Sequence, residues 1–369
     1  MKIKAAVVRE YNKPVAVEEI DLALPKANEV LVKTAYTGFC HSDLTMFGGS
    51  GNMPLPWVPG HEAAGVVEDV GPGVTSVTKG DHVVATWMVS CGHCPQCRKG
   101  QGQICQTGFA LHGLGGLLDG TSRLTDSQGA RLNHQTNISG FAEYMVIPEA
   151  AAFKLRKDLP LEQACFLGCC LITGFGAVYN AAGVKPADSV AIWGMGGVGL
   201  NVVRGAVLRG GNPIIGVDLE GSKESIAREF GVTHFINSSE QDPVPIVKDL
   251  TDGGADYCFE VIGDPGAITQ AYWALGMGGT LITVGVTPEK EMTSLPLFYN
   301  PLHCKSVKGT LYGNIEPNRD IPVLADMAAR GDFKLDRLIG KMFRIEEIND
   351  VAEAMKKRQV VGRWVCTWE

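Results

Sequence analysis

Four side chains capable of chemistry stand together in the stretch Phe39-Cys40-His41-Ser42-Asp43. A thiol, an imidazole, a hydroxyl and a carboxylate could bind a metal ion and move a proton, although a polar turn beside a small core cysteine has the same composition. His61 and Glu62 follow a second β-rich segment. A catalytic zinc ion needs three protein ligands and one open position. Cys40 and His61 are therefore candidate ligands, and the pair Cys169-Cys170 offers two thiols for the third place.

A second group of cysteines has the spacing of a closed metal site. Two-residue gaps let successive thiolates converge on one tetrahedral ion, and four thiolates saturate it. Redox disulfides are the alternative, but four thiols spaced in this way serve one zinc ion better than two independent bridges. The sequence therefore predicts a structural zinc site at Cys91, Cys94, Cys97 and Cys105.

A glycine-rich turn follows the apolar segment 189–193 and opens a helical pattern. Such glycines permit a tight turn and let the backbone approach a pyrophosphate at the positive end of a helix, although a turn without a ligand is also common. A second apolar segment delivers Asp218, whose carboxylate would bind the adenosine ribose and repel a 2′-phosphate. Lys223 could reach the same ribose or lie in solvent. The pattern predicts an NAD(H) site at Gly194, Gly196, Gly197, Val198 and Gly199 with Asp218.

The elements that must position these residues fall into two kinds. From residue 2 to about residue 153 the sequence is rich in β-branched residues separated by turns. From about 171 to 310 short apolar strands alternate with helical segments, including a helix over 222–230, which is typical of a parallel sheet covered on both faces. Residues 346–358 have helical periodicity. The polar, glycine-rich segment Thr107–Ile138 is predicted to be a long surface loop.

Composition narrows the class of protein. A chain of 369 residues with 45% hydrophobic residues can form two folded domains. The net charge of −7 argues against a nucleic-acid partner. The first fourteen residues do not have the pattern of a signal peptide, and the most apolar stretch, 189–208, is interrupted by glycines, so we expect no membrane span. We expect a soluble, cytoplasmic protein whose cysteines are reduced.

Taken together, these motifs resemble the zinc-dependent medium-chain alcohol dehydrogenases of the long-loop type, which includes the liver-like and formaldehyde-related classes. The resemblance covers nearly the whole chain and rests on GFCHSD, GHE, the four-cysteine lobe, LGCC followed by Thr173, GMGGVG and Gly362-Arg363. It implies an α/β fold with two domains. Residues 1–170 and 311–369 would form a GroES-like β-rich catalytic domain with its zinc lobe at 91–105. Residues 171–310 would form a Rossmann domain with a doubly wound parallel sheet.

The resemblance also implies roles for single residues. In the family the third ligand immediately follows the glycine, which selects Cys169 over Cys170, so the catalytic zinc set is Cys40, His61 and Cys169. Glu62 resembles the carboxylate in the second sphere of that ion. Ser42 would take the proton of the alcohol, and Asp43 would orient the His61 imidazole. The residues implied at the cofactor are His41 and Arg363 on the pyrophosphate, Thr173, the glycine turn, Asp218 and Lys223.

The expected function is interconversion of hydrophobic or aromatic primary alcohols and aldehydes by hydride transfer, with two Zn²⁺ per chain and NAD(H). Trp87, Phe141, Val286 and Leu311 would line the substrate pocket, or each could be an ordinary core residue. A thiol-adduct (S-hydroxymethyl) formaldehyde dehydrogenase is one alternative, disfavoured because residues 44–61 contain no carboxylate. A non-catalytic zinc-binding member of the fold is another. We expect a homodimer with no nucleic-acid or membrane partner.

Overall fold

The computed structural model describes residues 1–296 and 298–368. It divides the chain into one unit of Met1–Cys169 with Glu316–Glu369 and a second unit of Cys170–Ile315. The sequence placed these borders after residue 170 and before residue 311. The structure places the second border later, after Ile315. The reason is that the turn η7 (Tyr312–Asn314) packs on helix α4 (Cys170–Gly176) of the second unit. A Cβ atom at Gly176 would lie only 2.3 Å from the Gly313 carbonyl oxygen, so this contact is between two backbones.

The first unit is rich in β-strands, as its β-branched sequence predicts, and most of its strand pairs are antiparallel. Among the described residues it holds a five-stranded sheet, in the order β1-β2-β7-β8-β4, and a seven-stranded sheet, in the order β10-β6-β5-β3-β18-β17 with β9 on β3. The strands are β1 (Lys2–Val7), β2 (Ala16–Leu22), β3 (Glu29–Gly38), β4 (Trp57–Val58), β5 (Ala63–Val70), β6 (His82–Ala85), β7 (Leu124–Thr125), β8 (Arg131–His134), β9 (Tyr144–Pro148), β10 (Ala152–Leu155), β17 (Ile339–Phe343) and β18 (Arg363–Thr367).

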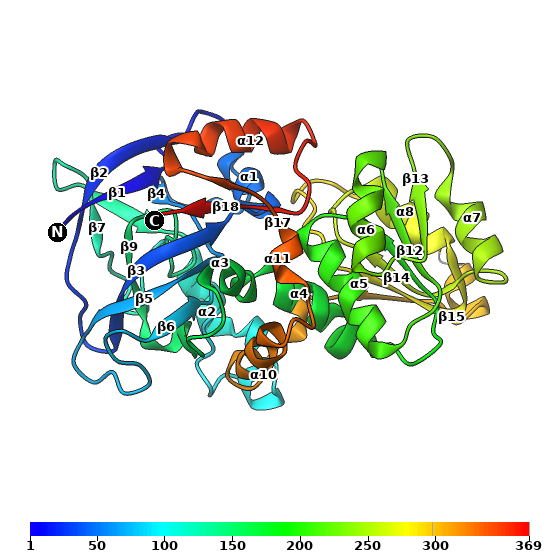
Figure 1. Ribbon diagram of the computed structural model, residues 1–369, viewed down its shortest axis with the longest axis horizontal. Helices are drawn as coiled ribbons and strands as arrows, with labels where there is room; N and C mark the ends of the chain where they lie inside the picture. The colour runs from blue at the N-terminus through cyan, green and yellow to red at the C-terminus, as the bar shows by residue number, and fades with distance from the viewer. Residues whose placement is uncertain (297, 369) are drawn as a thin grey trace. The chain divides into compact units, whose positions relative to one another are not determined.

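Both ends of the chain contribute to this unit. Strand β3 runs through the seven-stranded sheet, and β18 from the C-terminal tail pairs with it, with Val365 opposite Gly38. Figure 1 shows β18 in red beside β3 in blue. The helix predicted over 346–358 is α12 (Ile348–Lys356), whose buried face belongs to the same hydrophobic cluster as Phe39 and Phe343. The predicted GroES-like fold is confirmed for residues 26–157, and the tail strand β18 pairs with β3 of the same unit.

The prediction of a long surface loop over Thr107–Ile138 is wrong. The segment continues helix α2 (Gln106–His112) and contains strands β7 and β8, which pair with each other and join β2. Helix α2 begins there because the Cys105 side chain accepts a hydrogen bond from the Gly108 N–H. The polar composition of this segment does not reveal that it contains a buried ion pair. Arg123 is only 2% exposed, and its guanidinium binds the Glu29 carboxylate.

The second unit is a parallel sheet with helical crossovers, as predicted. In its described part the strand order is β13-β12-β11-β14-β15-β16, so the order reverses at β11. This is the doubly wound arrangement whose ligand crevice lies at the carboxyl ends of the strands on either side of the reversal. The strands are β11 (Val190–Trp193), β12 (Ile214–Asp218), β13 (His234–Asn237), β14 (Ala255–Glu260), β15 (Leu275–Thr283) and β16 (Ser306–Gly309). The main crossover helices are α5 (Gly197–Arg209), α6 (Glu224–Phe230), α7 (Pro243–Leu250) and α8 (Pro265–Trp273).

In the described residues, no single helix is both long enough and apolar enough to cross a membrane. One bent pair, Leu161–Gly168 with Cys170–Ala182, meets the criteria of length and composition, and most of its residues are buried in the fold.

Candidate metal centres and cofactor site

Three loops of the first unit bring the predicted catalytic ligands together. Cys40 lies just after β3, at the N-terminus of helix α1 (His41–Phe47), and His61 lies just before β5. Cys169 follows the short helix η4 (Cys165–Gly168). This helix packs closely on the backbone at Ala85, since a Cβ atom at Gly168 would lie 3.0 Å from the Ala85 carbonyl oxygen. The ligand atoms of Cys40, His61 and Cys169 all lie within 4.8 Å of one another. The three predicted donors therefore face one point.

Asp43 holds the imidazole of His61, as predicted. Its Oδ1 atom lies 2.9 Å from His61 Nδ1, while its Oδ2 atom accepts the Cys40 N–H at 2.9 Å. A carboxylate at Nδ1 fixes the tautomer with hydrogen on that nitrogen, which leaves the Nε2 lone pair for a metal ion. The hydroxyl of Ser42 lies 3.1 Å from that Nε2 atom. Ser42 therefore stands directly beside the ligand set.

The electrostatics of these three donors favour a bound cation. A hydrogen bond from Cys169 holds the pKa of the Cys40 thiol well below its ordinary value, and that same bond, together with burial, raises the pKa of Cys169. Burial lowers the pKa of His61, but Asp43 and Cys40 together raise it well above its ordinary value. Within the protein alone, the two neighbouring donors therefore favour the ionised form of the Cys40 thiol. A zinc ion would supply positive charge and allow both thiols to ionise, so the donor set fits zinc.

Glu62 and Arg363 form a buried pair next to this centre. Glu62 is fully buried, and the Arg363 Nε atom lies 3.2 Å from its Oε2 atom. Arg363 also donates a hydrogen bond to the Phe39 carbonyl oxygen at 3.1 Å. The guanidinium is thus anchored within the first unit, whereas His41 is exposed at the start of α1. The predicted contacts of His41 and Arg363 with a pyrophosphate remain predictions.

The four clustered cysteines form a second, compact donor set. Their sulfur atoms lie within 4.8 Å of one another, with 4.0 Å between Cys91 and Cys97 and 4.0 Å between Cys94 and Cys105. Thiolates held at about 2.3 Å from a tetrahedral zinc ion lie about 3.8 Å apart, so little movement is needed. Backbone N–H groups stabilise these sulfurs, among them that of Cys94 on Cys91 at 3.3 Å. The N–H of His93, with other hydrogen bonds, lowers the pKa of Cys91 to about 5.

The glycine turn of the second unit has the shape of a phosphate cradle. Gly194 has a φ of +103°, and a Cβ atom at Gly199 would lie 1.8 Å from the Gly194 carbonyl oxygen. Gly196 is different, since a Cβ atom there meets no other atom within 4 Å. Gly196 is the N-cap of the thirteen-residue helix α5, so the open space lies at the positive end of a helix dipole. The cradle therefore fits a pyrophosphate. Gly197 and Val198 form the first turn of α5.

Asp218 stands at the end of β12 and organises this turn. Its carboxylate accepts the Met195 N–H at 2.7 Å and the Glu220 N–H at 3.0 Å. Lys223 lies 3.0 Å from the same carboxylate, with a side chain only 13% exposed. The alternative of a solvated Lys223 is therefore wrong, because the ammonium forms an ion pair with Asp218. Any direct contact of Lys223 with a ribose remains a prediction.

The residues predicted to line a substrate pocket divide between the units. In the first unit Trp87 is half-buried, and Phe141 is fully buried and packs on Phe39 and Phe343. The alternative interpretation of Phe141 as a core residue agrees with this packing. In the second unit Leu311 is half-buried and Val286 is 70% exposed, so Val286 is not a core residue. Thr173, half-buried in α4, also belongs to the second unit.

Three features of the sites were not anticipated. Gln135 is buried and contacts Asp43, and no spacing signal marks it. Glu260, at the end of β14, accepts the N–H groups of Ile262 and Gly263 at 2.8 and 2.7 Å and so holds the loop beside the glycine turn.

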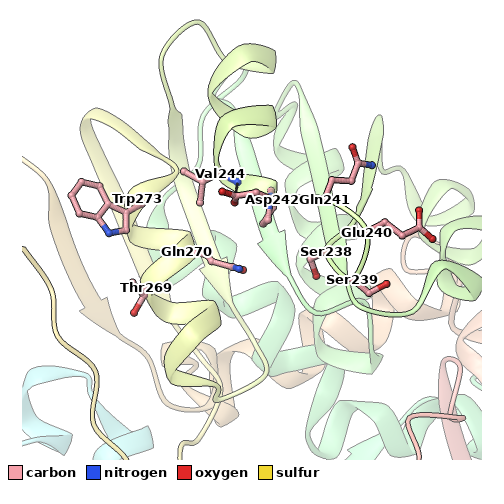
Figure 2. Close-up of a pocket in the computed structure, with 10 residues that line it drawn as sticks. Ser238, Ser239, Glu240, Gln241, Asp242, Val244, Thr269, Gln270 and Trp273 are labelled. Carbon is pink, nitrogen blue, oxygen red and sulfur yellow. Dashed lines mark hydrogen bonds between the residues drawn. The ribbon is translucent and has the colours of Figure 1, made fainter.

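A polar hollow of about 600 Å³ lies one strand beyond Asp218, where α8 residues face the loop after β13 (Figure 2). Its lining includes Ser238, Asp242, Thr269, Gln270 and Trp273.

A cluster of four cysteines, a set of two cysteines and one histidine, and a glycine turn shaped for a phosphate are together typical of a zinc-dependent dehydrogenase. Residues 26–157 match the alcohol dehydrogenase GroES-like domain family, and residues 197–330 match the zinc-binding dehydrogenase family. The chain belongs to the zinc-dependent medium-chain alcohol dehydrogenase family, whose members are oxidoreductases.

Individual relatives extend this similarity over almost the whole chain. The chain is 38% identical over 360 residues to an alcohol dehydrogenase class-3 from Cereibacter sphaeroides, covering 95% of each chain. It is 38% identical over 359 residues to an S-(hydroxymethyl)glutathione dehydrogenase from Paracoccus denitrificans, again covering 95% of each. The crystal structure of a benzyl alcohol dehydrogenase from Acinetobacter calcoaceticus superimposes with a TM-score of 0.93 at 34% identity, covering 100% of this chain and 99% of that one.

The contrast between Gly199 and Gly196 gives a direct test of the cradle. We expect Gly199→Ala to destabilise the protein by about 1–3 kcal/mol, because the added methyl overlaps the Gly194 carbonyl and the turn must open. Gly196→Ala should leave the unfolding temperature unchanged but weaken NADH binding, because its methyl enters the open space at the end of α5. Thermal unfolding and NADH fluorescence titration measure the two effects. Wild-type NADH affinity in Gly196→Ala would show that no phosphate binds there.

Proposed function

We propose that the protein is a zinc- and NAD-dependent alcohol dehydrogenase that interconverts hydrophobic or aromatic primary alcohols and their aldehydes. The observation that carries this proposal is the position of Ser42, whose hydroxyl lies 3.1 Å from the ligand atom of His61. A purely structural zinc site has no use for a proton-accepting hydroxyl beside its ligands. The same argument weighs against a non-catalytic zinc-binding protein.

We propose two zinc ions per chain. The buried set of Cys40, His61 and Cys169 leaves a fourth position for substrate, whereas the four-cysteine set is complete by itself. When bound at the first set, zinc acts as a Lewis acid that lowers the pKa of an alcohol. Ser42 can then accept the proton of the alcohol at Oγ while it donates its own hydroxyl proton to a hydrogen-bonded water, and Asp43 keeps the His61 ring in the required tautomer.

The cofactor proposed is NAD(H), bound across the cradle of the second unit. The Asp218 carboxylate would accept a ribose hydroxyl and repel a 2′-phosphate. Because Lys223 already neutralises part of this charge, the discrimination against NADP(H) should be weaker than for an isolated carboxylate. Glu260 holds the neighbouring loop, whose Ile262 side chain is 44% exposed at the same edge of the sheet.

Two substrate classes have specific support. The similarity to a benzyl alcohol dehydrogenase favours an aromatic primary alcohol. The similarity to an S-(hydroxymethyl)glutathione dehydrogenase favours a thiol adduct of formaldehyde, and it supports this second candidate as well as the first. We retain the aromatic alcohol as the main proposal because residues 44–61 offer no carboxylate to recognise a glutathione amine. The thiol adduct is the second candidate.

The proposed assembly is a homodimer in the cytoplasm. In the described residues strand β16 pairs on one side only, with β15, and all four of its residues are exposed. Phe298, Leu302 and Val307 are exposed on or next to this strand. An open edge with apolar neighbours is a natural surface for pairing with a second copy. A molecular mass in solution equal to one chain would contradict the dimer.

The assignment of the third ligand is tested by comparing two neighbouring cysteines. Cys169→Ser should lower the zinc content from two ions to one per chain and reduce alcohol oxidation by about 10³-fold or more, because the Lewis acid is worth several kcal/mol. Cys170→Ser should keep both ions, since Cys170 lies outside the ligand set. Metal analysis with steady-state kinetics measures both. The opposite pattern, with zinc lost only from Cys170→Ser, would refute the ligand set.

The proposed reaction is tested by a matched panel of substrates and cofactors. Formation of NADH should be seen with benzyl alcohol and NAD⁺, and kcat/KM should be lower with NADP⁺ because of Asp218. Formaldehyde mixed with glutathione is the competing substrate. Turnover of that adduct with no turnover of free aromatic alcohols would favour the second candidate. A preference for NADP⁺ would contradict the role given to Asp218, and no turnover with any of these would favour the non-catalytic alternative.

A further inference from the structure

Gln135 joins two parts of the catalytic metal centre through one side chain. The residue is 1% exposed. Its Oε1 atom accepts a hydrogen bond from the Gly60 N–H, and its Nε2 atom lies 3.2 Å from Asp43 Oδ1. Gly60 immediately precedes the ligand His61, and Asp43 holds the ring of that histidine. One amide therefore contacts both the backbone that carries the ligand and the group that orients it.

The partners of Gln135 fix the direction of its amide. A backbone N–H can only be met by the carbonyl oxygen of the amide, and a carboxylate can only be met by its NH₂ group. The reversed amide would place two donors together at Gly60 and two acceptors together at Asp43. The side chain is thus held in one orientation, as a bridge between a donor and an acceptor.

The bridge matters because Asp43 is a fully buried carboxylate. A buried charge is tolerated only when hydrogen-bond donors replace its water. The donors around Asp43 are the Cys40 N–H, the His61 ring and the Gln135 amide, and the first two come from metal ligands. Without the Gln135 amide, the Asp43 carboxylate would lose one of its three donors. It would have to move to find another, and that movement would displace Cys40 and His61.

The loop that presents Gln135 is held in an unfavourable conformation. Thr136, Asn137 and Ser139 have φ values of +48°, +69° and +70°, which are rare for residues with a side chain. Such conformations persist where the surrounding structure imposes them, and they are common at functional sites.

The surroundings that impose this conformation are the residues just before the ligand His61. Three backbone hydrogen bonds join the loop to these residues. The Gln135 N–H donates to the Val58 carbonyl at 3.2 Å. The N–H groups of Gly140 and Phe141 donate to the carbonyls of Gly60 and Pro59 at 2.8 and 2.9 Å. The strained loop and the ligand-bearing segment are therefore held together along their length.

We propose that Gln135 is a positioning residue for the catalytic metal ion. By tying Asp43 to Gly60, it fixes the direction of the His61 lone pair and so raises the affinity of the centre for zinc. This inference rests on the proposed catalytic zinc site, and it assigns Gln135 no contact with substrate.

The test compares Gln135→Met with Asn133→Leu in the zinc-loaded protein. Methionine keeps the volume of glutamine but cannot bridge the two groups. Asn133 is a matched control, because it is also buried, lies two residues earlier, and directs its amide to the carbonyls of Pro54 and Pro56. Zinc is removed with increasing concentrations of a competing chelator, and the ions retained per chain are counted. The four-cysteine centre serves as the internal standard.

We expect Gln135→Met to bind its catalytic zinc about 10–100-fold more weakly while the second ion stays bound. Asn133→Leu should lower the unfolding temperature without changing zinc retention. Zinc retention in Gln135→Met equal to that of wild type would overturn the proposal, whatever its activity. A wild-type protein that holds one ion only, at the four-cysteine centre, would instead refute the proposed catalytic site.

A second variant covers the case in which Gln135→Met does not fold. Gln135→Glu keeps an acceptor for the Gly60 N–H but places a carboxylate against Asp43. The proposal predicts a loss of zinc affinity at least as large as for methionine, and a changed visible spectrum when cobalt replaces the catalytic ion. Unchanged zinc affinity together with an unchanged cobalt spectrum would count against the proposal.

Discussion

The catalytic half of this molecule depends on the buried carboxylate of Asp43. One of its oxygens binds the backbone N–H of Cys40 and the other binds the ring of His61, so two of the three proposed zinc ligands are held by one group. The carboxylate is fully buried and is therefore stable only while all its donors remain in place. The start of α1 directly after β3, the positive φ of Gly60 and the strained loop from Gln135 to Ser139 bring those donors to it.

In the second unit, carboxylates at two strand ends likewise accept hydrogen bonds from the backbone of neighbouring loops. Asp218 accepts backbone N–H groups from the glycine turn and from the residues that follow β12, and Glu260 accepts them from the loop that follows β14. In each case a carboxylate at the carboxyl end of a parallel strand fixes a loop that would otherwise lack regular hydrogen bonds. A carboxylate that organises a loop and also meets a ligand is hard to replace, because its removal disturbs both.

The sequence predicted those features whose signal lies in spacing or periodicity. The spacing of Cys91 to Cys105 predicts their convergence, and the strand, glycine turn and helix around Gly194 follow from short-range pattern. The choice of Cys169 over Cys170 came from family resemblance alone. Gln135 could not be predicted, because its contacts depend on a loop with no period and three left-handed residues. The pairing of Lys223 with Asp218 does not follow from the sequence, because the lysine lies beyond the end of β12 and its spacing from Asp218 does not show which way the chain turns.

We propose that the chain holds zinc at two chemically different centres. X-ray absorption at the zinc edge of the purified protein distinguishes these centres, because it counts the sulfur and nitrogen neighbours of the bound ions. The donor sets predict about three sulfur neighbours per ion on average at about 2.3 Å, with a histidine nitrogen contributed by one centre. An average of about four sulfurs with no histidine signal would mean that only the four-cysteine centre binds zinc, and it would contradict the account of Cys40, His61 and Cys169.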